Sequence, residues 1–272
     1  MKIIDESKML QRLDDIDLSS VRQYEKYLEK LTLSAEKTIS RSNLTAKEVF
    51  IMPYPLPGEL GNILTKHALE ALAAGQAHAR ILTDEQHTTF ERKNKLAAPI
   101  SVDPANFWIT PTAAIDALEV RENMLANDVE GELWRDVKKT LLEHLQGATR
   151  KETITALALL PKVNLRRAEL IITTEGTYAY NRGRLKGYQE AQVDYVRFSA
   201  VMDMRTSDQC RSRHGKIIAM NSPDLANNTP PLHGRCRSLL SPLFSEYYPE
   251  YFTEEALDWS KTAPLPKGWR PG

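Results

Sequence analysis

Cysteine is scarce in this chain. Only Cys210 and Cys236 occur among 272 residues, and both lie in the last quarter of the sequence. Small secreted domains stapled by disulfides carry many more cysteines, so this class of protein is excluded. One disulfide between the two stays open, but histidines flank both cysteines, which favours a reducing compartment and a metal site.

The sequence has neither a long apolar run nor an excess of charge of one sign. No stretch of about 18 apolar residues occurs, which predicts no transmembrane helix and no membrane partner. Residues 1–6 also lack the apolar core of a signal peptide. Lys plus Arg and Asp plus Glu both number 36, so the formal net charge is zero. A protein that coats DNA non-specifically is usually basic, so any contact with DNA must be local.

Apolar residues at helical spacing run through most of the chain. They predict a helical region over residues 1–50 and a helical body over residues 62–190. Between them, three prolines and two glycines in residues 51–61 indicate a linker or arm, which is either a plain loop or a segment that docks on a partner. Within the body, Thr149 and Glu152 form a capping-box pattern. Pro161 is expected to end the helix that begins there, and Asn164 to cap the next one.

The pattern changes after about residue 190. Residues 193–202 alternate between apolar and polar, which predicts a strand, and residues 216–220 predict a second strand. Thr206 or Ser207 can cap a short helix between them, which Gly215 can end. We therefore predict a mainly α-helical body with a small C-terminal α+β module over residues 191–245, followed by a tail over residues 246–272.

The segment from Met202 to Pro242 carries the most specific pattern in the sequence. Its landmarks are, in order, Asp203, Arg205, Thr206, Ser207, Cys210, His214, Gly215, Pro230, Pro231, His233, Cys236, Arg237 and Ser238. This order resembles the C-terminal signature of the Mu F-like head morphogenesis family of phages. The stretch from Arg167 to Gly183 is similar to the helix that precedes this signature in the family. The resemblance covers residues 150–245 and is specific as a whole motif, although no single piece is.

The resemblance implies a function that composition does not show. It implies a minor head protein of a phage or prophage, present in few copies and assembled in the host cytoplasm into the head of the virion. The implied partners are the portal protein, the major capsid protein or both, with packaged DNA as a further one. The implied role lies in head assembly or in DNA packaging and delivery. Family members often carry cysteine where Ser207 and Ser238 stand here, so this chain is a cysteine-poor member.

Four side chains of the motif are suitable metal ligands: Cys210, His214, His233 and Cys236. A Cys-x3-His spacing on a helix places both side chains on one face, and a His-x2-Cys spacing in a tight turn has the same effect. Two such pairs brought together form the closed tetrahedral set that structural zinc prefers, and zinc is the one cofactor we predict. The alternative is that both cysteines are small buried residues and both histidines make ordinary hydrogen bonds.

Asp203 and Arg205 invite an enzymatic interpretation in which Asp203 acts as a base. A short acidic side chain after a strand more often caps a turn, here at the helix start near Thr206, and Arg205 can then pair with it. The sequence shows no set of nucleophile, base and orienting group beside them, so we expect no enzyme. We assign the following residues to the structure of the motif: Asp203, Arg205, Thr206, Gly215, Pro231 and Arg237.

Positive charge is concentrated in the same segment. Residues 197–237 contain seven basic and three acidic residues, a local net charge of +4. Arg211, Arg213 and Arg235 are candidates for contact with DNA phosphates, although a solvated basic face explains the same pattern. One rival function is a zinc-stapled module that binds nucleic acid, which the zero net charge disfavours. The other is an enzyme of the toxin, nuclease or ADP-ribosyltransferase type, for which little chain follows the motif.

Overall fold

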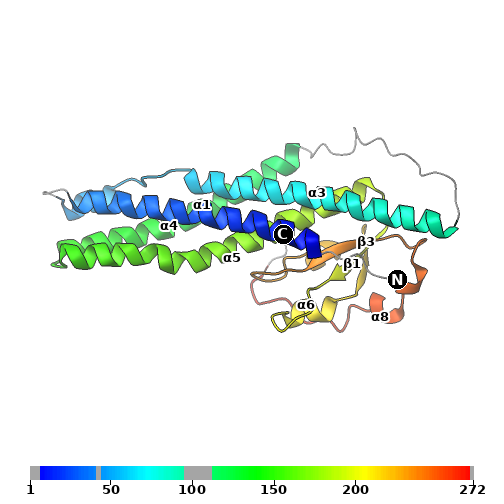
Figure 1. Ribbon diagram of the computed structural model, residues 1–272. Coiled ribbons are helices and arrows are strands. Elements are labelled where there is room, and N and C mark those ends of the chain that lie inside the picture. The colour runs from blue at the N-terminus through cyan, green and yellow to red at the C-terminus, as the bar shows by residue number, and fades with distance from the viewer. Residues whose placement is uncertain (1–6, 41–43, 95–111, 270–272) are drawn as a thin grey trace. The chain divides into compact units, whose positions relative to one another are not determined.

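A computed structural model describes residues 7–40, 44–94 and 112–269 (Figure 1). The long helices come first, as α1 (Ser7–Ile39), α2 (Ala46–Ile51), α3 (Glu59–Asn94), α4 (Thr112–Leu145) and α5 (Arg150–Glu190). The remaining elements are β1 (Tyr195–Ser199), α6 (Asp208–Arg213), β2 (Ile217–Ala219), α7 (Leu225–Asn228), β3 (Leu239–Leu243), η1 (Pro249–Tyr251) and α8 (Glu254–Leu257). The predicted fold class, a helical body with a small C-terminal α+β module, is confirmed. None of the helices in these ranges is both long and apolar enough to cross a membrane.

The chain divides into two compact units. The first, called here the helical unit, consists of Ile16–Ala68 and Thr112–Ile172. The second, called the mixed unit, consists of the described residues of Met1–Asp15, Leu69–Pro111 and Thr173–Gly272. The mixed unit is therefore larger than the predicted 191–245 module, because it includes parts of α3 and α5.

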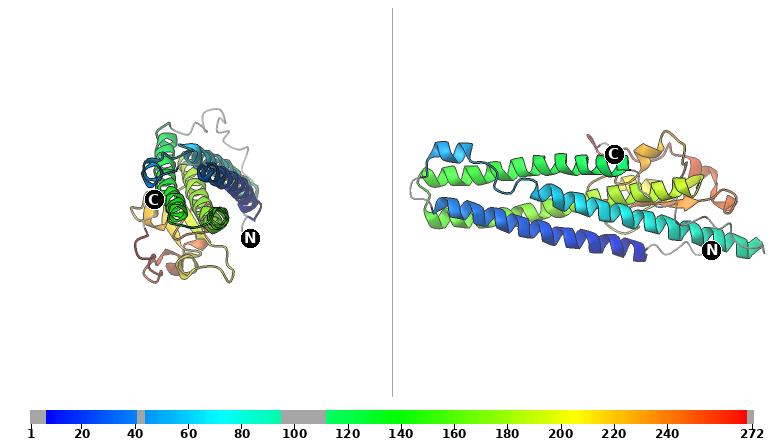
Figure 2. Two further views of the ribbon diagram at one scale, coloured as in Figure 1. Left: turned by 90° about the vertical axis from the view of Figure 1, so that its left-hand side faces the viewer. Right: turned by 90° about the horizontal axis from the view of Figure 1, so that it is seen from above.

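The core of the helical unit is built from apolar side chains that recur at helical spacing. Within this unit α1, α4 and α5 lie side by side (Figure 2). The buried residues include Tyr24, Tyr27, Leu28, Leu31 and Ala35 on α1; Val129, Leu133, Val137 and Leu141 on α4; and Leu157, Ala168 and Ile172 on α5. Steps of three and four residues return to one face of a helix, so the sequence pattern places these side chains together.

The proline-rich stretch at residues 51–61 packs against the helical unit. Its apolar side chains at Met52, Tyr54 and Leu56 contact the core. The Tyr54 ring meets the Trp134 ring edge-on with centroids 5.6 Å apart, and the Trp134 indole donates to the Met52 carbonyl at 3.1 Å. The predicted linker is thus a fixed strap. Phe50, which precedes the strap, and Ile51, its first residue, are exposed.

Helix α5 continues through the proline that was expected to end it. The capping box at its start is present: the Thr149 amide donates to the Glu152 carboxylate at 2.7 Å, and the Glu152 amide donates to the Thr149 hydroxyl at 3.2 Å. Pro161 lies inside the helix, and Asn164 donates to the Leu160 carbonyl at 2.8 Å instead of capping a new helix. A proline in a helix interior costs about 3 kcal/mol. Burial of the apolar face of α5 on both sides of it outweighs that cost.

Three antiparallel strands form the sheet of the mixed unit, in the order β2-β1-β3. Strands β1 and β2 lie inside the two segments predicted as strands. Strand β3 was not predicted, because it contains Pro242, which pairs with Val196 of β1. Proline is tolerated there because β3 is an edge strand. The Pro242 carbonyl accepts from Gln86 of α3 at 2.7 Å, so α3 satisfies part of this edge.

Two glycines allow α3 and α5 to approach closely within the mixed unit. A Cβ atom added at Gly75 of α3 would lie 2.1 Å from the Tyr180 carbonyl oxygen of α5. A Cβ atom added at Gly183 of α5 would lie 2.1 Å from the Leu72 carbonyl oxygen of α3. Such distances are far below van der Waals contact, so this helix pair needs glycine at both positions.

The C-terminal segment, predicted as a tail, is folded onto the module through residue 269. The Trp259 indole donates to the Ile217 carbonyl of the edge strand β2 at 2.8 Å. The Trp269 indole donates to the carbonyl of Pro231 at 3.1 Å. Pro231 itself is buried and follows a cis peptide bond after Pro230. The C-terminal segment therefore packs against β2, the edge strand on the side of the sheet opposite β3.

Candidate functional site

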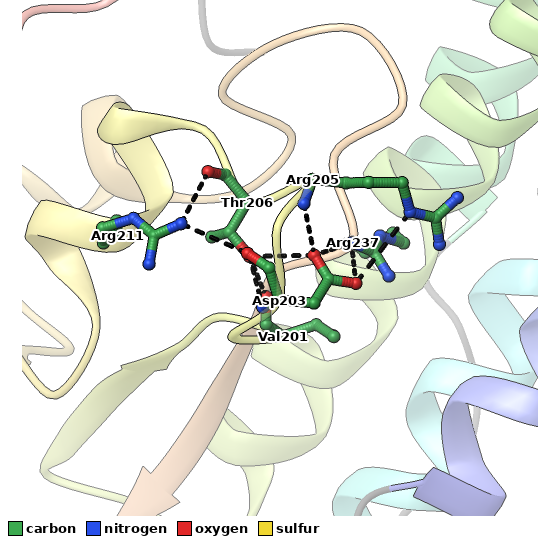
Figure 3. Close-up of polar contacts among 6 residues, drawn as sticks. All are labelled: Val201, Asp203, Arg205, Thr206, Arg211 and Arg237. Carbon is green, nitrogen blue, oxygen red and sulfur yellow. Dashed lines mark hydrogen bonds and ion pairs between the residues drawn. The ribbon is translucent and has the colours of Figure 1, made fainter.

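The chain after β1 forms a tight turn over residues 201–206 (Figure 3). The Thr206 hydroxyl donates to the Val201 carbonyl and accepts from the Asp203 amide at 2.9 Å. The Asp203 carboxylate accepts from the Arg205 amide at 2.9 Å. Arg211 donates to the carbonyls of Asp203 and Thr206 at 3.2 and 3.3 Å. Side chains of the motif thus close the turn on itself.

Arg237 joins this turn to the second half of the motif. Its guanidinium donates to both carboxylate oxygens of Asp203 at 2.8 Å, across 34 residues of sequence (Figure 3). Arg205, the partner proposed from the sequence, has its Nε 3.9 Å from the carboxylate and is largely exposed. The hydrogen bond from Arg237 is the main reason that the pKa of Asp203 lies below its ordinary value. Asp203 is therefore an ionised structural carboxylate.

Helix α6 carries Cys210 but ends before His214. Ser207 caps the helix by accepting from the Cys210 amide at 3.3 Å. The backbone of His214 has already left the helical conformation, with φ of −57° and ψ of 125°. Gly215 follows with a φ of 84°, which turns the chain back toward the sheet. The argument that placed Cys210 and His214 on one helical face fails because the helix stops one residue too early.

Cys210, His233 and Cys236 meet in the mixed unit. The Cys210 sulfur lies 3.2 Å from Nε2 of His233 and 3.6 Å from the Cys236 sulfur. All three ligand atoms lie within 4.8 Å of one another. Both cysteines are free and buried, while His233 is half-buried. His214, the fourth ligand expected from the sequence, lies outside this group; its Nδ1 accepts from the Ala200 amide at 3.1 Å.

Hydrogen bonds divide the charge of this group unequally. The bond with Cys236, followed by the one with His233, lowers the pKa of Cys210 to about 4 against the opposing effect of burial. The same bond with Cys210, together with burial, raises the pKa of Cys236 well above its ordinary value. Hydrogen bonding to Cys210 also raises the pKa of His233. Cysteine sulfur and imidazole nitrogen are both soft or borderline metal ligands.

A polar face of α5 positions the second half of the motif. The Thr177 hydroxyl donates to the Cys236 carbonyl at 2.7 Å, and the Thr174 hydroxyl accepts from the Arg235 amide at 3.1 Å. Asn181 continues the same face, four residues after Thr177. None of these three residues was predicted from the sequence. The available signal was a row of threonine and asparagine at steps of three and four residues within a helix.

The three arginines predicted to contact DNA have different environments. Arg213 is only 5% exposed, and it donates to the Asn228 side chain at 2.9 Å and to the Ala263 carbonyl at 2.8 Å. That candidate is corrected: its guanidinium cross-links two segments of the mixed unit and does not face solvent. Arg211 and Arg235 are exposed. Much of the local positive charge is thus used inside the fold.

Comparison with known families identifies one match. Residues 125–241 match the family described as Phage Mu protein F like protein. The matched stretch begins in α4, takes in all of α5 and ends within β3, so it includes the Asp203 turn and the Cys210 group. The resemblance seen in the sequence is confirmed over this stretch. No curated protein and no solved structure matches the chain.

Proposed function

We propose that this chain, whose residues 125–241 match the family described as Phage Mu protein F like protein, is a minor head protein of the virion. In this proposal it is located at the portal or on the inner capsid surface and acts in head assembly or in DNA packaging and delivery. The family match carries the proposal, because it covers the region in which the sequence motif and the folded site coincide. A low copy number and contact with the portal or the major capsid protein follow from the same assignment.

The geometry of the motif supports a structural role. Asp203 is held by Arg237 and closes a turn, while Arg213 ties α6 to the C-terminal segment. These side chains connect parts of the mixed unit to one another. A rigid module of this kind suits a protein whose function is to be built into a larger assembly.

An enzymatic function would rest on Cys210 and His233, because a thiolate beside an imidazole is the pairing that cysteine nucleophiles use. Cys210 is only 2% exposed, and its sulfur contacts both His233 and the sulfur of Cys236. A substrate carbonyl cannot reach this sulfur without opening the module. We therefore infer that this pair is not an enzymatic active site.

Binding of nucleic acid is the second candidate function, and the exposed cations of the motif are its only support. Arg213 is buried, and Lys216 donates to the Glu255 carbonyl. Contact with DNA would then depend on Arg205, Arg211 and Arg235, so it should be weak and steeply dependent on salt. Replacing Arg205 and Arg235 with Ala should flatten the salt dependence of binding, whereas tight binding that ignores salt would favour a dedicated nucleic-acid module.

Incorporation into heads is the direct test of the proposed function. A phage or prophage that lacks the gene is complemented with a tagged copy of the chain, and purified heads and portal complexes are analysed by quantitative mass spectrometry. We expect the chain in heads at a few copies per particle, and in portal or capsid complexes. Heads without it, together with a free monomer in the lysate, would contradict the assignment.

Surface variants sharpen this test. Phe50 and Ile51 are 76% and 65% exposed beside the proline-rich strap, so replacing both with Ser should not disturb the fold. If the strap region contacts another head protein, this variant should be depleted from heads. Leu33→Ser is the matched control, because Leu33 is also a large exposed apolar residue, at 56%, on α1. Equal incorporation of both variants would place the contact elsewhere and leave the head assignment intact.

A further inference from the structure

The ligand atoms of Cys210, His233 and Cys236 lie close enough together to share one metal ion. Zinc binds thiolate at about 2.3 Å with tetrahedral angles, so two thiolates on one ion lie about 3.8 Å apart. The two sulfurs here are 3.6 Å apart. A disulfide would bring them to about 2.05 Å. We propose that these three side chains bind one zinc ion, with the fourth coordination position left for water.

The orientation of His233 supports this site. Its Nδ1 lies 2.8 Å from the Gly234 carbonyl oxygen, which can only accept, so the proton of a neutral ring is on Nδ1. Its Nε2 lone pair then faces the Cys210 sulfur, 3.2 Å away. Histidines that bind metal typically donate their other ring N–H to a carbonyl or a carboxylate in this way.

Charge balance supports it as well. Two thiolates and a neutral imidazole around Zn²⁺ give a site with no net charge, which is what a buried position requires. Both cysteines are 2% exposed or less, so two thiolates at these positions need a cation to offset their charge. A single zinc ion would bind all three ligand atoms at once.

The surroundings define a fourth position. Ser207 accepts from the Cys210 amide at 3.3 Å, and the side chains of Ser207 and Ser238 both contribute to lowering the pKa of Cys210, so they lie next to the ligand group. Serine hydroxyls are poor zinc ligands, and three protein ligands with an open position are typical of sites that keep a water or bind an external group. A thiol placed at position 238 would stand where a fourth protein ligand can reach the ion.

The zinc ion would connect the two halves of the motif. Cys210 belongs to α6, while His233 and Cys236 follow the loop that contains α7. Further links between these halves are the ion pair between Asp203 and Arg237 and the hydrogen bond from Arg213 to Asn228. Removal of zinc should therefore loosen the segment between residues 210 and 236 first, and this effect is separate from whether the chain assembles into heads.

Metal analysis of the purified full-length chain tests the proposal. The chain is stripped with a chelator under reducing conditions, reloaded with zinc or cobalt(II), and desalted. We expect one metal ion per chain, and a cobalt(II) spectrum with thiolate charge-transfer bands. Cys210→Ser, Cys236→Ser and His233→Gln should each lose the metal. His214→Asn is the matched control: it keeps an acceptor for the Ala200 amide and should retain zinc.

A gain-of-ligand variant keeps the test decisive if the cysteine variants fold poorly. Ser238→Cys should bind zinc more tightly in competition with a chelator and should strengthen the cobalt(II) charge-transfer bands. Ser19→Cys, which adds a thiol at an exposed position of α1, should leave both unchanged. Two results would overturn the proposal. One is a metal content no higher than that of the Cys210→Ser/Cys236→Ser double variant, and the other is a metal-free protein whose mass shows a disulfide.

Discussion

The two units of this chain differ in the kind of contact that stabilises each of them internally. The helical unit is built around an apolar stripe on α1, α4 and α5, and the buried side chains of this stripe are all hydrophobic. In the mixed unit, buried polar side chains of α5 bond to the backbone of β3 and of the segment before it. Thr177 donates to the Cys236 carbonyl, Asn181 accepts from the Leu240 amide, and Tyr188 donates to the Leu240 carbonyl.

This difference explains why a recognisable motif lies in the mixed unit. Apolar burial has no direction and scales with area, so many sequences can build the same helical core. A hydrogen bond requires a particular donor and acceptor at a particular angle. Segments held by such bonds therefore tolerate fewer residue types at each position, and their sequence carries a specific pattern.

Replacements that conserve volume should separate the two units most clearly. Asn181→Leu removes the partner of the Leu240 amide and of the Ser238 carbonyl. A buried backbone group left without a partner costs about 1–3 kcal/mol, and two groups are affected. Leu141→Met in the helical unit keeps its apolar volume and should cost less than about 1.5 kcal/mol. Urea unfolding followed by circular dichroism measures the free energy of unfolding of both variants. Equal losses of stability would contradict the proposed difference between the two units.

Glycine substitutions should have opposite signs in the two units. Gly183→Ala in the mixed unit forces a methyl group to 2.1 Å from the Leu72 carbonyl oxygen, and such overpacking costs about 1–3 kcal/mol. Gly131→Ala on α4 meets no atom within 4 Å, so it should stabilise the helical unit by up to about 1 kcal/mol through helix propensity. Thermal melts of the two variants decide the point. A neutral Gly183→Ala would show that α3 and α5 can separate without loss.

The smallest expected effect is a pH dependence at Asp203. Because the hydrogen bond from Arg237 lowers its pKa in the folded protein, the contribution of Asp203 to stability is fully present above the unfolded pKa of about 3.9. It is lost as the pH falls through the lower, folded value. Wild type should thus exceed Asp203→Asn in urea midpoint at neutral pH, and this difference should vanish in strong acid.

The comparison with Asp203→Asn isolates that carboxylate from other acids. Asp14, whose pKa is raised chiefly by burial and which senses the charge of Arg237, titrates in both proteins and cancels in the difference. A difference in urea midpoint that persists unchanged into strong acid would mean that hydrogen bonds of uncharged groups, and not the ion pair between Asp203 and Arg237, hold the turn.

How far the sequence predicts this structure differs between elements. Helical spacing located α1, α3, α4 and α5, and alternation located β1 and β2, because these patterns report neighbours within one element. Strand β3 was missed because Pro242 is unfavourable in most strands, and only its edge position allows it. Pro161 was expected to end a helix, but packing on both sides keeps α5 continuous.

The sequence by itself determined the fold class, the family resemblance and the set of residues in the motif. Only the tertiary structure decided which of those residues meet. Asp203 pairs with Arg237 across 34 residues in preference to Arg205, and Cys210 meets His233 across 23 residues while His214 turns away. The physical reason is that spacing fixes neighbours only while a helix or strand continues. Once α6 stops, contacts depend on the path of the loop, and the polar face of α5 sets that path.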